Sequence, residues 1–77
     1  MTREKKIERF IFEHGIDVFK VERIARGHYK IFKSYNEYTS FKLNNAHYSD
    51  TVTYSYGRIF EVLTDMLEEQ KAYSDIA

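Results

Sequence analysis

A stripe of mainly apolar residues between Tyr56 and Gln70 recurs at helical spacing, and it constrains the fold more than any other feature of the sequence. Its members are Tyr56, Ile59, Phe60, Leu63, Met66, Leu67 and Gln70. Spacings of three and four residues place side chains on one face of a helix, so the stripe predicts an amphipathic helix that must bury that face. The helix has two possible start positions. Ser55 can cap a helix that begins at Tyr56, whereas Ser49 can cap a longer one in which Val52 extends the stripe.

The length of the chain limits it to one hydrophobic core. It has 77 residues and no cysteine, so neither disulfides nor a cysteine-bound zinc can support a small core. Seven tyrosines and six phenylalanines can fill the core, since each buried aromatic removes about 150–250 Å² from water. We therefore expect a single compact domain over residues 1–77. No apolar stretch approaches the roughly 20 residues that span a bilayer, and no signal-peptide core is present, so we expect a cytoplasmic protein without membrane contact.

Residues 3–14 predict a first helix. Its apolar stripe consists of Ile7, Phe10, Ile11 and His14, spaced i, i+3, i+4 and i+7. Thr2 is suited to cap its start, and Gly15 is suited to the left-handed conformation that ends a helix.

The intervening segment changes to a strand-like pattern. Residues 18–26, 28–33 and 38–43 are rich in β-branched and aromatic side chains with partial alternation, which predicts three strands. Gly27 marks the first turn and residues 34–37 mark the second, and such short connections require antiparallel neighbours. The predicted fold is α+β with element order α-β-β-β-α: a three-stranded antiparallel meander packed against two amphipathic helices.

Charge is distributed unevenly along the chain. Residues 1–42 hold ten Lys and Arg against six Asp and Glu, whereas residues 43–77 hold two against six. If the apolar strand residues face the helices, the opposite sheet face combines cations with aromatics, as in proteins that bind single-stranded nucleic acid or RNA. The candidate nucleic-acid-binding residues are Lys20, Arg26, His28, Lys30, Phe32 and Lys42. The alternative interpretation is an ordinary solvated sheet face covered by long cationic side chains.

The acidic half concentrates its charge on the second predicted helix. Glu61, Asp65 and Glu68 fall at i, i+4 and i+7 with Glu69 beside them, so they form a row opposite the apolar face. Such a row can engage a basic surface, or it can simply keep the helix solvated. Tyrosines in the loop before this helix add interface-forming side chains. The candidate partner-binding residues are Glu61, Asp65, Glu68, Glu69, Tyr48 and Tyr54.

The sequence contains no pattern typical of an active site. His14, His28 and His47 are widely separated and lack neighbours at metal-ligand spacing, so no metal site is predicted. No nucleophile motif, glycine-rich phosphate loop or cofactor fingerprint is present. We therefore predict a non-enzymatic protein without cofactors.

In size, in its Lys-, Tyr-, Asn- and Ile-rich composition and in its predicted element order, the chain resembles the small accessory proteins of phages and mobile elements of low-GC bacteria, including anti-CRISPR inhibitors. The resemblance implies a protein that occupies a functional surface of a host protein that handles nucleic acid. Our leading hypothesis is thus a protein-binding regulator or inhibitor whose partner presents a basic surface. A nucleic-acid-binding module is the alternative, and a homodimer through a sheet edge or an apolar helix surface is also open.

Overall fold

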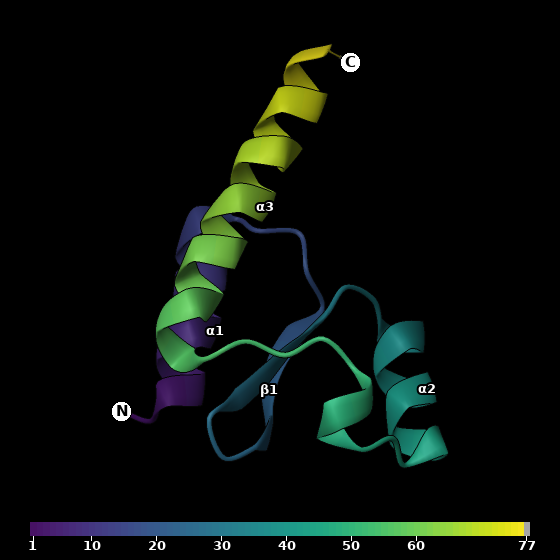
Figure 1. Cartoon of the computed structure of the whole chain (residues 1–77). Coiled ribbons are helices and arrows are strands. Elements are labelled where there is room, and N and C mark those ends of the chain that lie inside the picture. The colour runs from purple at the N-terminus through teal and green to yellow at the C-terminus, as the bar shows by residue number, and fades with distance from the viewer. Residues whose placement is uncertain (77) are drawn as a thin grey trace.

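A computed structural model of the chain describes the backbone of residues 1–76 and the side chains of residues 1–74. The elements are α1 (Arg3–His14), β1 (Lys20–Ala25), β2 (His28–Phe32), α2 (Tyr35–Asn44), the 3₁₀ helix η1 (Tyr48–Asp50) and α3 (Tyr56–Ile76) (Figure 1). Within these residues the sheet has two antiparallel strands, and α2 occupies the place of the predicted third strand. The prediction of a three-stranded meander with two helices is therefore wrong; the order is α-β-β-α-α. None of the helices in this part of the chain is both long and apolar enough to cross a membrane.

The error over residues 38–43 has a local cause in the capping of α2. The Ser34 hydroxyl accepts a hydrogen bond from the Glu37 backbone N–H at 3.1 Å, which caps the start of the helix. The Ser-x-x-Glu spacing of this pair is the capping-box pattern, a helix-start signal that outweighs the short apolar alternation that follows it. Asn45 ends the helix in the left-handed conformation with φ of 54°, which asparagine tolerates better than most residues do.

Helix α2 also has a packing reason to form. Tyr38 and Phe41 are three residues apart, so a helix places both on one side. Their rings pack against Phe32 of β2, with centroids 5.0 and 5.4 Å from the Phe32 ring. Phe32 is fully buried as a result.

The predicted ends of α1 are confirmed. Thr2 Oγ1 accepts a hydrogen bond from the Lys5 N–H at 3.2 Å. Gly15 adopts φ of 62°, and the Ile16 N–H donates to the Ile11 carbonyl at 3.1 Å, which closes the helix and turns the chain toward β1.

The hairpin of β1 and β2 turns at Gly27 and is bridged to the segment that precedes α3. Gly27 makes the turn with φ of 74°, as predicted, and the register shifts between Arg23 and Ala25. On the outer side of β2, Tyr29 and Tyr54 exchange two backbone hydrogen bonds of 2.8 and 2.9 Å. This isolated bridge fixes the segment that leads into α3.

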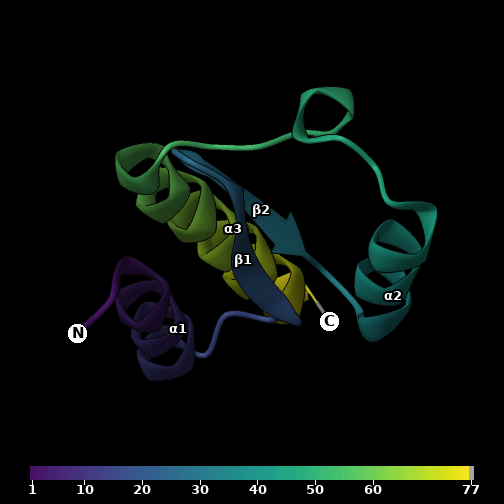
Figure 2. The ribbon, with the colours of Figure 1, turned by 90° about the horizontal axis from the view of Figure 1, so that it is seen from below.

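The main core lies between the hairpin and the pair α1 and α3. Its buried residues are Ile7, Ile16, Val21, Tyr29, Ile59, Leu63 and Leu67. On the other side of the hairpin lie α2 and η1, so helical segments flank it on both sides (Figures 1 and 2). Neither side of the hairpin is the open sheet face that the sequence predicted.

Helix α3 starts at the later of the two predicted positions. The Ser55 hydroxyl accepts the Arg58 N–H at 3.3 Å and the Ser55 carbonyl accepts the Ile59 N–H at 3.0 Å, whereas Ser49 belongs to η1. The distal part of α3 projects past the other elements (Figure 1). The radius of gyration of 13.0 Å accordingly exceeds the roughly 11.5 Å expected for a compact chain of this length.

Candidate interaction surface

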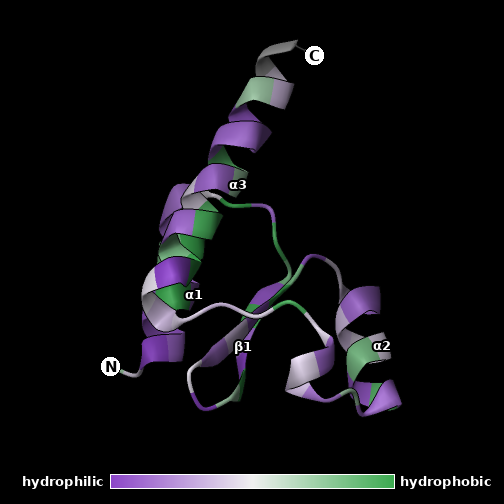
Figure 3. Ribbon diagram, viewed as in Figure 1, coloured by the Kyte–Doolittle hydropathy of each residue, from purple (hydrophilic) through white to green (hydrophobic). Residues whose placement is uncertain are grey.

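The outer side of α3 carries the predicted row of carboxylates, here called the acidic face: Glu61, Asp65, Glu68 and Glu69. All four are exposed, whereas Ile59, Leu63 and Leu67 on the opposite side of the helix are buried. Hydrophilic and hydrophobic segments alternate along the α3 ribbon, as expected of an amphipathic helix (Figure 3). The acidic face is therefore free to contact a partner without disturbing the core.

Little of this charge is neutralised within the chain. Arg58 forms an ion pair with Glu61, three residues further along the helix. In residues 1–74, Asp65, Glu68 and Glu69 form no ion pair within 4.0 Å. Helix α1 differs, because two of its acids are paired with cations on the same helix, Glu8 with Lys5 and Glu13 with Arg9. The acidic face is thus a distinct negative surface on a chain of zero net charge.

The two candidate tyrosines lie away from the acidic face. Tyr54 is half-buried and packs against the core beside its backbone bridge to Tyr29. Tyr48 lies in η1, where its ring is 4.5 Å from that of His28 and 4.4 Å from that of His47. Of the predicted partner-binding set, only Tyr48 therefore lies on the α2 side of the hairpin, whereas Tyr54 lies at the edge of β2 toward α3.

Helix α2 and residues 46–54 cover much of the side of the hairpin on which the candidates of β2 lie. Phe32 is fully buried and cannot stack on a base. The Lys30 Nζ donates to Thr51 Oγ1 at 2.8 Å, and His28 Nδ1 lies 2.9 Å from Thr53 Oγ1. Both side chains therefore link β2 to the loop before α3.

The other basic candidates are dispersed. Lys42 Nζ pairs with Glu22 at 3.0 Å, and Lys20 Nζ lies over the Tyr38 ring, 4.9 Å from its centroid. Arg26 is exposed beside the hairpin turn. The structure brings these cations together only in part, and mostly in contacts that stabilise the fold.

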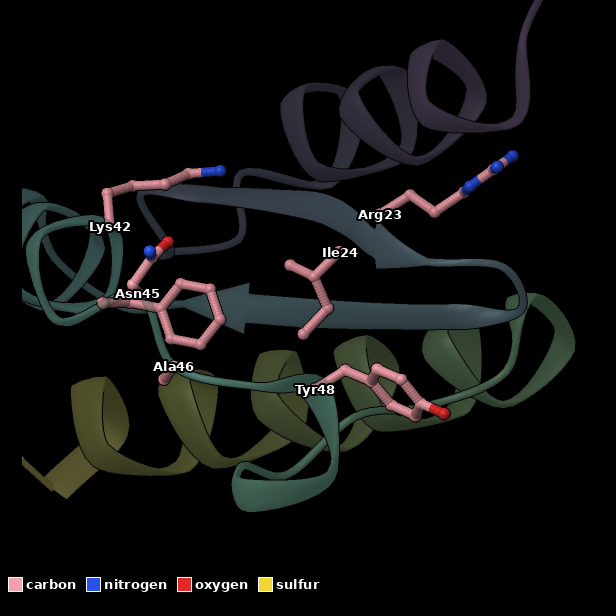
Figure 4. A pocket seen from close by; sticks show the side chains of 7 residues that line it. Arg23, Ile24, Lys42, Asn45, Ala46 and Tyr48 are labelled. Atoms are coloured by element: carbon pink, nitrogen blue, oxygen red, sulfur yellow. The ribbon is translucent and has the colours of Figure 1, made fainter.

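A hollow of about 230 Å³ opens between the hairpin and the end of α2. Arg23 and Ile24 line it from the hairpin, Lys42 and Asn45 from α2 and its cap, and Tyr48 from η1 (Figure 4). Arg23 extends away from the other labelled side chains in Figure 4, so the cations do not converge on one point. Arg23 and Asn45 carried no recognisable functional pattern in the sequence.

The histidines make local contacts. His14 Nδ1 lies 2.9 Å from the Phe10 carbonyl, and His47 Nδ1 accepts the Ser49 N–H at 3.2 Å, so each ring caps or steadies its own segment. Among the side chains of residues 1–74, no three His, Asp or Glu residues are grouped so that they could hold a metal ion.

Tyr73 is a further exposed residue that the sequence pattern did not mark. It is 77% exposed on the projecting part of α3, four residues after Glu69. In the sequence, only the spacing of four residues from Glu69 indicates that this large aromatic ring lies beside the acidic face.

No family model, curated protein or solved structure matches the chain. The surface itself therefore carries the functional argument.

Proposed function

We propose that this chain is a non-enzymatic regulator that binds another protein, applying the acidic face of α3 to a basic surface. The observation that carries the proposal is the exposure of Asp65, Glu68 and Glu69 without a counter-ion in the described residues. Like charges at these helical spacings destabilise a helix by roughly 0.2–0.5 kcal/mol per pair. A partner that supplies Lys or Arg removes this repulsion, so binding relieves an unfavourable feature of the free protein.

The target class follows from the charge of the acidic face. Proteins that handle nucleic acid present basic surfaces to phosphates, and a row of carboxylates can occupy such a surface. Electrostatic attraction of this kind speeds association and weakens as salt screens it, over about 10 Å at 0.1 M ionic strength. We therefore expect binding that is strong at low salt and declines steeply as ionic strength rises.

The test compares two charge reversals of equal size in capture from a nuclease-treated bacterial lysate. One variant carries Asp65→Lys and Glu68→Lys on the acidic face, and the control carries Glu4→Lys and Glu13→Lys on α1. Both raise the net charge equally, and circular dichroism verifies that both remain folded. The proposal requires a protein that the wild type and the α1 variant capture and the α3 variant does not.

Two results would overturn the proposal. Equal capture by the two variants would show that net charge, and not the acidic face, governs binding. Capture by the wild type from an untreated lysate that is lost entirely in the nuclease-treated lysate would favour the nucleic-acid-binding alternative instead.

A further inference from the structure

Helix α3 carries a second apolar stripe, which flanks the one buried in the core and shares Met66 with it, because Met66 also packs against the core. Val62, Met66 and Tyr73 follow one another at i, i+4 and i+11, so they share one side of the helix. Val62 and Met66 are half-buried, and Tyr73 is 77% exposed. The core of this chain leaves the stripe only partly covered.

Two hollows lie along this stripe and share lining residues. One of about 360 Å³ lies between α3, β2 and the loop that precedes α3, and Val52, 66% exposed, adds to its apolar lining. The other, of about 510 Å³, lies beside Tyr73. Lys33 and Met66 line both, so the two hollows adjoin each other, and together they are here called the α3 groove. From Val62 to Tyr73 the helix rises about 16 Å, which is three helical turns.

The charges that line the α3 groove favour a cationic occupant. Its acids are Asp17, Glu37 and Glu69, against the cations Lys30 and Lys33. Lys30 keeps its charge in its 2.8 Å hydrogen bond to Thr51 and lies at the Val62 end, so the excess of acids is at the Tyr73 end, where Asp17 and Glu69 accompany Lys33 alone. Glu69 also belongs to the acidic face, so the negative surface continues from the groove around the outside of α3.

We infer that the α3 groove receives an amphipathic basic helix of the partner protein. This inference rests on the proposed function and adds the form of the partner: aliphatic side chains lie against Val62, Met66 and Tyr73, while Lys or Arg side chains reach Glu69 and Asp65. A helix laid in an apolar groove is a recurrent mode of recognition, and three turns give it room for anchors at i, i+4 and i+7. The α3 helix of a second copy is a poor occupant, because two acidic faces would meet.

The probe is a synthetic peptide of about 18 residues, or five helical turns, with Leu at spacings of three and four and Lys elsewhere. One control peptide has the same composition in shuffled order, and another has Glu in place of Lys. Fluorescence anisotropy measures affinity at low salt and at about 0.3 M salt. We expect saturable binding of the first peptide and much weaker binding of both controls.

Tyr73→Ala tests the groove, with Phe12→Ala as the matched control. Phe12 is an aromatic on α1 that is 87% exposed, so both changes remove an exposed ring without touching the core. We expect Tyr73→Ala to weaken binding about tenfold at both salt concentrations, because an exposed tyrosine in an apolar groove is the kind of side chain that forms a hot spot. Phe12→Ala leaves the affinity unchanged.

The outcomes separate the groove from the acidic face. If Asp65→Lys with Glu68→Lys abolishes peptide binding but Tyr73→Ala has no effect, the acidic face stands and the groove inference is overturned. If only Tyr73→Ala weakens binding, the proposed use of the acidic face fails. The inference is also overturned if the shuffled peptide binds equally well, or if binding of the amphipathic peptide does not saturate up to about 200 μM. Self-association in sedimentation that Tyr73→Ala abolishes also overturns it and assigns the groove to a second copy.

Discussion

Truncation of Phe32 tests whether helix α2 covers the side of the hairpin on which Phe32 lies, as the structure has it. The sequence pattern predicted that this side is open. Phe32 is fully buried between the rings of Tyr38 and Phe41, with centroids 5.0 and 5.4 Å away. Removing a buried phenylalanine ring costs about 3–5 kcal/mol, through lost apolar burial and the cavity left behind. The whole chain is expected to have an unfolding free energy of roughly 4–11 kcal/mol. Phe32→Ala should therefore remove a large part of the stability.

Urea denaturation followed by circular dichroism measures this loss. For a domain of this size, 3–5 kcal/mol corresponds to a fall of about 2–4 M in the urea midpoint. Phe12→Ala is the matched control, and because Phe12 is 87% exposed its effect should stay within about 0.5 kcal/mol. A loss below about 1 kcal/mol for Phe32→Ala would refute the reasoning, since it would lie near the roughly 0.5 kcal/mol of a surface substitution and far below the cost of removing a buried ring. Phe32 would then lie on an open face and be available to stack on a base.

Two further changes test the local energetics. Ser34→Ala removes the hydroxyl that caps α2, and the unfolding free energy should fall by about 1 kcal/mol in the same urea assay; no change would mean that the capping bond to Glu37 does not hold the helix. Asp65→Asn with Glu68→Gln removes two of the mutually repelling charges, so stability should stay constant or rise by a few tenths of a kcal/mol while capture of the partner is lost. A marked loss of stability in this double variant would show that the acidic face serves the fold and not a partner.

The parts of the fold that could be predicted are those set by local sequence. The stripe around Leu63, the caps at Thr2 and Ser55 and the turn at Gly27 each depend on residues within a few positions of one another. The segment around Tyr38 was wrongly assigned because its apolar residues fit both a strand and a helix. The side that Tyr38 and Phe41 cover is set by contacts with a distant strand, which alternation cannot reveal.

The candidate surfaces also differ in whether local sequence or distant contacts determine them. The acidic face needs only helical periodicity, so Asp65 and Glu68 lie where the sequence placed them. The basic set needed three strands in one sheet, and without the third strand Phe32 became core and Lys42 became the partner of Glu22. The α3 groove depends on how α3 lies against β2, which only the three-dimensional arrangement shows.

The most direct test of the central claim is an amide-resolved NMR titration of the isotope-labelled chain with the amphipathic Leu and Lys peptide. Binding at the acidic face and the α3 groove predicts the largest chemical-shift changes within residues 61–73, with smaller changes near Glu37. Changes concentrated around Arg23 and Tyr48, or the same pattern with the shuffled peptide, would contradict it.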